Sequence, residues 1–435
     1  MIRSFTAVAA VLTVPAFAGQ PCAPTWDIQL GDANTNALIA HVESYDAGSG
    51  AELYATGSFV NIDGVAASRI ARWDGAQWNP LGTGLAGNFS NELEVFNGDL
   101  YVAGYFNSAG GAAGSAKIAR WDGSQWFGLD AQLDLFTNSL WALKTWDDGT
   151  GDALYVGGNY VDAGGAGGPD FIAKWDGAAF SPVGGTIAGA GIPLIVLDIE
   201  VFQGELYIAG RFASVGGVAA SHIAKWDGST WSPVGSGITG TQVIQLGVAD
   251  DGNGEALYAG GNFTQAGGVP AANIAKWDGS TWSALGSGTT STVQAIAGFD
   301  DGNGPKVYVG GSFSGAGGQT VNGIATWDGS VWAPVGSGVG DIANESVFDL
   351  FPNGDRLTVS GSFQSIDGQP AIGRIAQYVA CEAGNPADFN GDGVVDGVDL
   401  AALLANWGMP GFTDLNDDGT TDGADLASLL ANWTP

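Results

Sequence analysis

The 435-residue chain is poor in basic residues, histidine, cysteine and methionine: it has 13 Lys and Arg together and two of each of the others. Nucleic-acid affinity depends largely on Lys and Arg neutralising phosphates, so a net charge of −32 makes nucleic acid a poor partner. The apolar run at the N-terminus is too short to span a bilayer comfortably, and no stretch after it approaches about 20 uninterrupted apolar residues, which argues against a membrane-embedded protein. Hydrophobic residues still make up 45% of the chain. We therefore expect a well-formed core under an acidic, soluble surface.

The N-terminal segment has the pattern of a secretory signal peptide. Arg3 precedes an apolar run, and Ala16 and Ala18 have the spacing that a signal peptidase needs. We predict a signal peptide at residues 1–18 and a secreted or cell-surface protein, with the periplasm as an alternative. Cys22 and Cys381 both lie in the exported part, where an oxidising environment lets a disulfide persist.

Seven copies of a unit of about 50 residues fill the region between the two cysteines. Each copy has an LYVGG-like run and an element related to IA(K/R)WDG, whose aromatic residue is Trp73, Trp121, Trp175, Trp226, Trp277, Trp327 or Tyr378. Short β-rich runs separated by Gly-rich or Asp-Gly turns predict four strands per copy. Seven such units fit an all-β, seven-bladed β-propeller around a central channel; a β-helix with shorter rungs is the alternative.

The repeated side chains allow two interpretations each. Aromatic residues on an exported protein suit sugar stacking, but tryptophans that recur in every copy more often pack between repeats. The basic residues before them are expected to pair with a recurrent carboxylate or carbonyl instead of forming a substrate site: Arg72, Arg120, Lys174, Lys225 and Lys276. Asp-rich loops at Asp147, Asp250 and Asp300 are expected to be turns, with weak calcium binding as the alternative.

The two ends of the repeat region are complementary. The segment Trp26–Gly31 resembles the strand that follows WDG in the other copies, whereas the seventh copy stops after Tyr378 without that strand. We predict that the N-terminal strand completes the last blade, which brings Cys22 and Cys381 together as a disulfide. In the chain-entropy view a bridge across so long a loop contributes roughly 4 to 5 kcal/mol. Two free or intermolecular thiols are the alternative.

The repeat resembles the kelch motif of galactose-oxidase-like propellers, in which a run ending in Gly-Gly is followed by an aromatic strand, a turn and a second Trp. This resemblance implies the fold but little about activity. Copper oxidase chemistry needs several histidines, and only His41 and His222 occur. No arginine cluster suits a sialidase, and no pair of carboxylates stands out for a glycosidase or lyase. We therefore predict no catalytic residue.

The composition changes at Asp388, where two acidic loops appear, each followed by a short apolar pattern. Oxygen ligands at loop positions 1, 3, 5, 7, 9 and 12, with Gly at position 6, are typical of an EF-hand-like calcium loop. The predicted ligands of two calcium ions are Asp388, Asn390, Asp392, Val394, Asp396 and Asp399 in the first loop, and Asp414, Asn416, Asp418, Thr420, Asp422 and Asp425 in the second. Leucines at helical spacing that end in Trp407 and Trp433 predict one helix stripe after each loop.

This duplicated loop-and-helix pattern resembles a type I dockerin, and especially the C-terminal modules of secreted planctomycete-type proteins. The resemblance implies two calcium ions and docking to a cohesin-like or other cell-surface anchoring protein. At positions 10 and 11 the chain has Gly397-Val398 and Gly423-Ala424, where the cellulosomal family often carries Ser-Thr pairs. Binding to a standard cohesin is therefore doubtful.

Together these patterns predict residues 1–18 as a signal peptide, 22–381 as a propeller, 382–387 as a linker and 388–435 as a dockerin-like module. The expected function is binding: an extracellular scaffold with a glycan or protein ligand on its propeller, displayed through the calcium module. The alternative is a component of extracellular polysaccharide degradation, either catalytic, as a carbohydrate-active hydrolase or lyase, or non-catalytic.

Overall fold

The computed structural model describes residues 24–28, 30, 35, 37–129, 139–159, 171–189, 193–340, 345–370, 374–381, 387–389, 394–411, 413–416 and 418–433. Contacts divide the chain into two units, Thr25–Val379 and a second that includes Ala380–Pro435. The predicted signal peptide, Cys22 and residues 382–386 of the predicted linker lie outside the described residues. Among the described residues, neither helix has the length or the apolar character needed to cross a membrane.

The first unit consists of seven antiparallel sheets, each built on a path of four strands. The inner strands are β2 (Ile39–Asp46), β8 (Leu85–Phe96), β12 (Leu140–Asp147), β17 (Ile195–Phe202), β23 (Ile238–Asp250), β28 (Val293–Asp300) and β34 (Val347–Asn353). The second strands are β3 (Ala51–Gly57), β9 (Asp99–Ala109), β13 (Asp152–Gly158), β18 (Glu205–Arg211), β24 (Glu255–Ala266), β29 (Pro305–Gly311) and β35 (Arg356–Gly361).

The third strands carry the IA(K/R)W element or a variant of it, and the outer strands contain the second aromatic residue of each sheet. The third strands are β6 (Ile70–Trp73), β10 (Ile118–Trp121), β14 (Ile172–Trp175), β21 (Ile223–Trp226), β26 (Ile274–Trp277), β32 (Ile324–Trp327) and β38 (Ile375–Val379). The outer strands are β7 (Trp78–Pro80), β11 (Trp126–Gly128), β15 (Phe180–Pro182), β22 (Trp231–Pro233), β27 (Trp282–Ala284), β33 (Trp332–Pro334) and β1 (Thr25–Asp27).

Ten further strands of two residues each form short ribbons or extend a sheet. They are β4 (Asn61–Ile62), β5 (Val65–Ala66), β16 (Ile187–Ala188), β19 (Ser214–Val215), β20 (Val218–Ala219), β25 (Val269–Pro270), β30 (Gly315–Ala316), β31 (Gln319–Thr320), β36 (Ser365–Ile366) and β37 (Gln369–Pro370).

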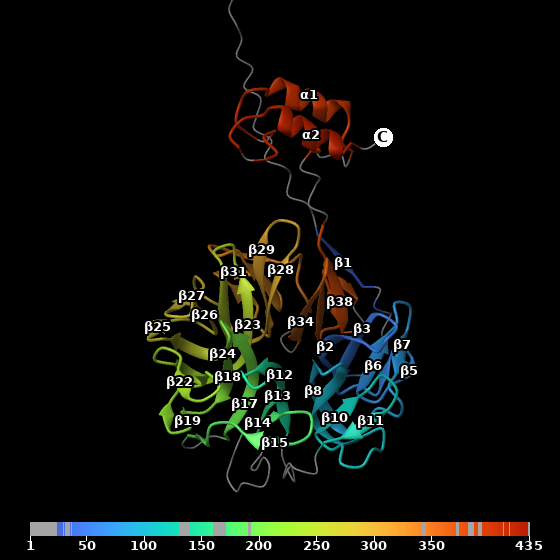
Figure 1. Ribbon diagram of the computed structural model, residues 1–435, viewed down its shortest axis with the longest axis vertical. Helices are drawn as coiled ribbons and strands as arrows, with labels where there is room; N and C mark the ends of the chain where they lie inside the picture. Colours follow the sequence, from blue (N-terminus) through green and yellow to red (C-terminus); the bar gives the residue numbers. More distant parts are fainter. Residues whose placement is uncertain are drawn as a thin grey trace, which may run out of the picture. The chain divides into compact units, whose positions relative to one another are not determined.

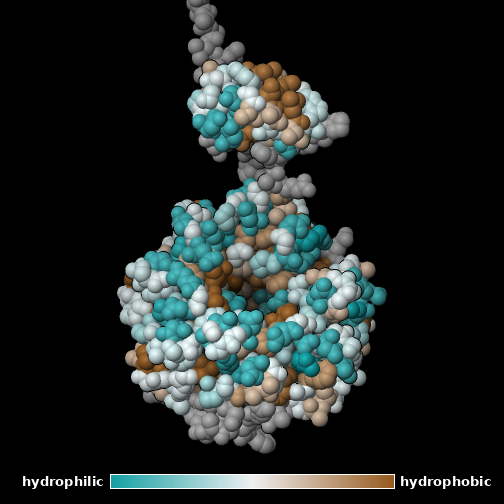
Figure 2. Space-filling model, viewed as in Figure 1, coloured by the Kyte–Doolittle hydropathy of each residue, from teal (hydrophilic) through white to brown (hydrophobic). Residues whose placement is uncertain are grey.

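The sheets form a closed ring. Each inner strand contacts the inner strand of the next sheet in chain order, and β34 of the last sheet contacts β2 of the first. Figure 1 shows the inner strands facing the middle of the ring, and Figure 2 shows a central hollow at the same place. The unit is therefore a β-propeller, and the all-β prediction is confirmed.

Strand β1 closes the last sheet, as the sequence predicts. It pairs antiparallel with β38, with Trp26 opposite Tyr378. The rings of these two residues lie 4.8 Å apart, in the same arrangement as the Trp-Trp pairs of other sheets. Asp27 also forms an ion pair with Arg356 on β35, with 2.8 Å between the carboxylate oxygen and the guanidinium nitrogen. The ends of the propeller sequence are thus joined within one sheet by backbone pairing, ring packing and charge.

The repeated aromatic and basic residues have structural roles. Trp282 and Trp332 are buried, and their indole N–H groups donate to carbonyl oxygens of the preceding repeat, Val234 and Leu285. This arrangement confirms the inter-repeat packing interpretation. The basic residues pair with carboxylates across the sheet in the predicted way: Arg72 with Glu52, Arg120 with Asp99, Lys174 with Asp148, Lys225 with Glu205, and Lys276 with Asp251.

The second unit contains two short helices, α1 (Gly397–Ala405) and α2 (Gly423–Ala431). Its small core includes Ala387, Val395, Leu403 and Leu429. The predicted apolar stripes are wrong at their C-terminal ends. Both helices stop before the tryptophans, and four side chains of the predicted stripes are 39–53% exposed: Leu404, Trp407, Leu430 and Trp433. Two helices of nine residues bury one leucine each at the centre and leave the next exposed.

Candidate functional site

Every inner strand of the propeller has a β-bulge at the same place. The register with the second strand skips one residue in all seven sheets, such as Ala40 between Ile39 and His41. The second strand carries a glycine beside each bulge, and a Cβ at Gly210 or Gly261 would overlap the backbone of the inner strand. Bulges change the direction of side chains. The glycines of the LYVGG-like runs therefore help to shape the wall of the channel.

Three positions of each inner strand form three rings around the channel: the bulged residue, the residue directly after it, and the residue two positions further on. The first ring contains the bulged residues Ala40, Asn91, Trp141, Leu197, Ile244, Gln294 and Phe348. The second ring contains His41, Glu92, Ala142, Asp198, Gln245, Ala295 and Asp349. The third ring contains Glu43, Glu94, Lys144, Glu200, Gly247, Ala297 and Phe351.

These rings line two adjoining cavities. The whole first ring lines a cavity of about 410 Å³. The whole third ring and most of the second line a cavity of about 270 Å³. Four residues of the second ring line both cavities: His41, Glu92, Gln245 and Asp349. The tryptophans recur in most repeats, whereas the residue type at each ring position differs from repeat to repeat. The seven copies therefore differ in sequence at the channel.

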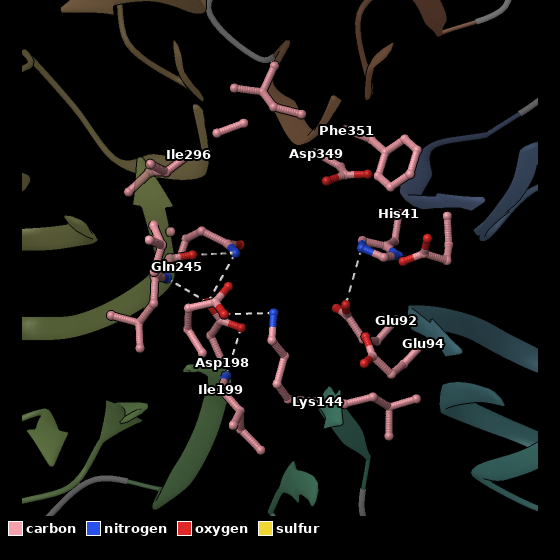
Figure 3. Close-up of a pocket in the computed structure, with 18 of the residues that line it drawn as sticks. His41, Glu92, Glu94, Lys144, Asp198, Ile199, Gln245, Ile296, Asp349 and Phe351 are labelled. Carbon is pink, nitrogen blue, oxygen red and sulfur yellow. Dashed lines mark hydrogen bonds and ion pairs between the residues drawn. The ribbon is translucent and has the colours of Figure 1, made fainter. Parts of the chain in front are cut away.

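The smaller cavity is strongly acidic. Six carboxylates line it, and the basic side chains among its lining residues are Lys144 and His41 (Figure 3). Lys144 forms a 2.7 Å ion pair with Glu200. Burial acts to lower the pKa of Lys144, but Glu200, Glu94 and Asp198 outweigh it and raise that pKa above its usual value. Lys144 is therefore a permanent cation that neutralises one of the six carboxylates.

His41 is held in one tautomer. Its Nδ1 accepts a hydrogen bond from the backbone N–H of Leu93 at 3.2 Å. Its Nε2 lies 3.2 Å from Oε1 of Glu92. Burial lowers the pKa of His41. The imidazole is thus neutral near pH 7, carries its proton on Nε2 and donates it toward Glu92 (Figure 3).

Three of the carboxylates also join neighbouring sheets. Asp349 accepts from the backbone N–H of Val42 at 2.7 Å, and Asp198 accepts from that of Leu246 at 2.5 Å. Glu94 accepts from the backbone N–H of Thr145 at 2.9 Å. Each of these side chains leaves one inner strand and binds the next. They stabilise the ring as well as line the channel.

The buried carboxyls hold their protons more tightly than free ones. Burial raises the pKa of Glu43 to about 8 and that of Asp198 to about 7. Burial also raises the pKa of Glu92 well above its usual value and raises the pKa of Glu94 and of Asp349, with neighbouring carboxylates adding to the effect on Glu92. Near neutral pH the cavity therefore holds protons that an incoming cation would displace.

The larger cavity is apolar and aromatic, and it contains unpaired polar atoms. The rings of Phe89 and Trp141 lie 5.9 Å apart. Within the described part of the chain, the buried Nε1 of Trp141 and the buried Oε1 of Gln294 have no hydrogen-bond partner. Both side chains line the larger cavity. Unpaired buried donors and acceptors are costly, so this wall suits a polar ligand.

Sequence reasoning did not find the channel residues. They occupy three positions in each repeat, yet the side chains at each position share no type, so no motif marks them. The sequence does contain one signal for these residues: they occupy positions that vary between copies of an otherwise regular repeat. Of the two histidines, only His41 lines the channel; Nδ1 of His222 lies 3.2 Å from the carbonyl oxygen of Gly210 instead.

The predicted calcium loops have matching local geometry in their described parts. In the second loop, both oxygens of Asp425 accept backbone N–H groups, from Leu415 and from Asp422. Asp399 does the same in the first loop, with Phe389 and Asp396. Asp396 and Asp422 each cap the following helix. Position 6 of the second loop has φ +94°.

The oxygen donors of the second loop lie along one turn. Asp414 accepts the backbone N–H of Gly419 at 2.8 Å, and Asn416 donates to Asp418 at 3.0 Å. Asn390, Asp392 and Gly393 of the first loop lie outside the described residues. Within the part that is described, no three His, Cys, Asp or Glu side chains are grouped closely enough to hold a metal ion. A set of oxygen donors on a turn with a left-handed glycine fits a hard cation such as calcium.

Comparison with known proteins gives distant likenesses of fold. No protein-family model and no curated protein matches the chain. Among solved structures, the extracellular domain of the putative one component system BT4673 from B. thetaiotaomicron is 9% identical, with a TM-score of 0.48 over 78% of this chain. The chain spans 38% of that structure's length.

Two further structures match over most of their own length. The WD40 β-propeller domain of Doa1 is 13% identical with a TM-score of 0.44, and the match covers 79% of this chain and 93% of that domain. BBS1N in complex with ARL6DN is 12% identical with a TM-score of 0.45, covering 82% and 95%. At this level of similarity, the assignment of a β-propeller rests on the chain's own sheets and their closed ring.

Proposed function

We propose that this protein is a secreted, seven-bladed, kelch-like β-propeller that binds a ligand in its channel and is displayed through a calcium-dependent, dockerin-like module. One observation carries the binding function. The repeat is regular at the positions that hold the blades together and irregular at the channel, where two adjoining cavities contain acidic, aromatic and amide side chains. A cavity with a few convergent polar groups and perturbed pKa values is the usual form of a binding site.

The C-terminal module provides the anchor in this proposal. The two loops would hold one calcium ion each, through Asp388, Asn390, Asp392, Val394, Asp396 and Asp399, and through Asp414, Asn416, Asp418, Thr420, Asp422 and Asp425. Calcium would supply the charge that lets these carboxylates crowd together, so folding and metal binding are coupled. The partner would be a cohesin-like or other cell-surface protein, bound without the Ser-Thr pairs of cellulosomal dockerins.

The proposed disulfide between Cys22 and Cys381 would reinforce the same seam as β1. Cys22 lies outside the described residues, and the pairing of Thr25 with Val379 supports the proposal because these residues are three and two positions from the two cysteines along the chain. An exported protein can keep such a bridge.

The binding function can be tested with a panel of glycans and small metabolites, screened against the full-length protein by the shift in its unfolding temperature. We expect at least one compound class to stabilise the protein, and its effect to disappear in a channel variant, Trp141→Ala combined with Glu92→Gln. Asp152→Asn, an exposed change on β13, is the control. Ligands that bind the channel variant as tightly as the unchanged protein would place the site elsewhere.

Polysaccharide degradation is the second candidate, and one observation favours it. Carboxyls with a raised pKa, such as Glu43 and Asp198, remain protonated near neutral pH as a general acid must. If the purified protein releases reducing sugar from plant or algal polysaccharides, and Glu43→Gln or Asp198→Asn abolishes the release, the protein is an enzyme and the binding proposal is incomplete.

A further inference from the structure

We infer that the ligand of the channel is an organic cation, whose ammonium group lies at the second and third rings and whose body occupies the aromatic cavity. This inference deepens the proposed function and rests on it, because it names the chemical class that the same channel takes.

The charge of the smaller cavity is the first argument. Six carboxylates line it: Glu43, Glu92, Glu94, Asp198, Glu200 and Asp349. Lys144 balances one of them, and His41 is neutral. Buried carboxylates without a counter-charge are costly, so the cavity either retains protons or binds a cation from outside. A ligand with an ammonium group supplies both the charge and the N–H donors that carboxylate oxygens accept.

The continuity of the two cavities is the second argument. His41, Glu92, Gln245 and Asp349 line both, so a charged group placed between Glu92 and Asp349 lies at the mouth of the larger cavity. Seven of the fifteen residues that line that cavity are apolar or aromatic, including Phe89, Trp141 and Phe348. A bare metal ion would leave this apolar space unused. An amine with an apolar or hydroxylated body fills both parts.

The unpaired polar atoms are the third argument, and they are independent of charge. Oε1 of Gln294 is a buried acceptor without a donor, and Nε1 of Trp141 is a buried donor without an acceptor in the described residues. Both side chains line the larger cavity, so a ligand that carries N–H and hydroxyl or carbonyl groups would offer a partner to each. Aromatic side chains also attract cations through their faces.

The experiment compares three probes of similar shape and different charge: phenethylamine, its neutral analogue 2-phenylethanol, and the anion 3-phenylpropionate. Binding to the full-length protein is measured by calorimetry and by Trp fluorescence in calcium-containing buffer of low ionic strength. We expect phenethylamine to bind at least about tenfold more tightly than the alcohol, and the anion not to bind, because burying a charge opposite a like charge is unfavourable.

Variants then locate the site. Glu92→Gln combined with Asp349→Asn should weaken phenethylamine about tenfold or more and leave the weak binding of the alcohol unchanged. Trp141→Ala should weaken both probes, and Trp141→Phe should restore most of the loss. Asp152→Asn is the matched control, because it removes one carboxylate from the exposed surface and should change neither. Circular dichroism of each variant shows whether it is folded.

The outcomes separate the inference from the proposed function. Equal binding of the amine and the alcohol, or an equal loss in Asp152→Asn, overturns the cationic ligand. If neutral glycans instead bind with an affinity that falls in Trp141→Ala and does not change in Glu92→Gln combined with Asp349→Asn, the channel function stands and the proposed ligand class is wrong. If no channel variant changes the binding of any compound in either panel, both proposals fail.

Discussion

Buried tyrosines in the second strands show how single residues stabilise the repeat. Oη of Tyr258 donates to Asp251 at 2.8 Å, and Nζ of Lys276 donates to the same carboxylate at 2.7 Å. Asp251 is 2% exposed. Burial acts to raise its pKa, but the hydrogen bonds from Lys276 and Tyr258 outweigh burial and lower it. The same three groups recur at Asp148, with Tyr155 and Lys174. At Asp301 the tyrosine recurs as Tyr308, but the lysine is Lys306 of the second strand, because Thr326 stands at the third-strand position.

Breaking this contact on one side should be costly. We expect Asp251→Asn to destabilise the propeller by about 3 kcal/mol, because Lys276 is left as a poorly solvated cation without its partner. The midpoint of denaturant unfolding measures the change. Lys276→Met combined with Asp251→Asn should lose less than the sum of the two single variants. Asp152→Asn, on the exposed side, should lie within about 0.5 kcal/mol of the unchanged protein. Additive effects would mean that the pair contributes nothing.

The channel carboxyls should act on stability in the opposite direction. The pKa of Glu43 rises from an ordinary 4.5 to about 8 in the folded protein. The folded state therefore binds this proton more tightly than the unfolded chain, and the free energy of unfolding should fall as pH rises between these two values. Glu43→Gln removes the effect. At pH 9 we expect the variant to be more stable than the unchanged protein by roughly 4 to 5 kcal/mol, because each pKa unit corresponds to about 1.36 kcal/mol, and near pH 4 to be equal to it. Thermal unfolding across this range is the measurement, and a difference that does not depend on pH would contradict it.

At the scale of elements, strand β1 determines whether the last sheet has an open edge. Without it, β38 would expose unpaired N–H and C=O groups, together with the ring of Tyr378 that now packs on Trp26. Six sheets take their outer strand from the residues just after their third strand, and only the last depends on the other end of the propeller sequence.

Two shortened proteins test this role. One begins at residue 24 and keeps β1; the other begins at residue 29 and lacks it. Both lack Cys22, so they differ in the strand and not in the disulfide. We expect the shorter protein to unfold at a lower temperature and to associate at high concentration, as measured by light scattering, because its free edge can pair with another copy. Equal behaviour of the two would show that the ring does not need the strand.

How far the sequence predicts each element depends on repetition. The tryptophans, their basic neighbours and the closing strand at Trp26 could be predicted because each is one member of a recurring pattern. The three rings could not, since a bulge leaves no motif and Glu92, Asp198 and Asp349 look like ordinary strand carboxylates until the ring brings them together. The predicted burial of Leu404 in an apolar stripe is wrong, because residue spacing alone does not tell where a nine-residue helix ends or what covers it.

At the scale of the whole molecule, the two units are stabilised in different ways. The propeller has apolar clusters spanning neighbouring sheets, including one that contains Trp226 and Trp231 of one sheet together with Trp146 and Tyr155 of the sheet before it. The second unit has a small core that includes Leu403 and Leu429, and its sequence contains two loops rich in carboxylates. The first can be expected to fold without added ions. The second brings like charges close together, which opposes folding unless a cation binds.

Removing calcium should therefore affect one unit and spare the other. With a chelator, we expect the helical signal of the C-terminal unit to fall in circular dichroism while the propeller's unfolding transition stays in place. Calcium at about 100 times its dissociation constant should stabilise the second unit by roughly 2.7 kcal/mol per site. Asp414→Asn combined with Asp418→Asn should halve the number of ions bound in calorimetry, whereas the matched propeller pair Asp250→Asn with Asp300→Asn should leave it at two. A propeller transition that shifts with calcium, or a loss of ions in the propeller pair, would mean that the acidic turns of the repeat hold the metal and the C-terminal loops do not act alone.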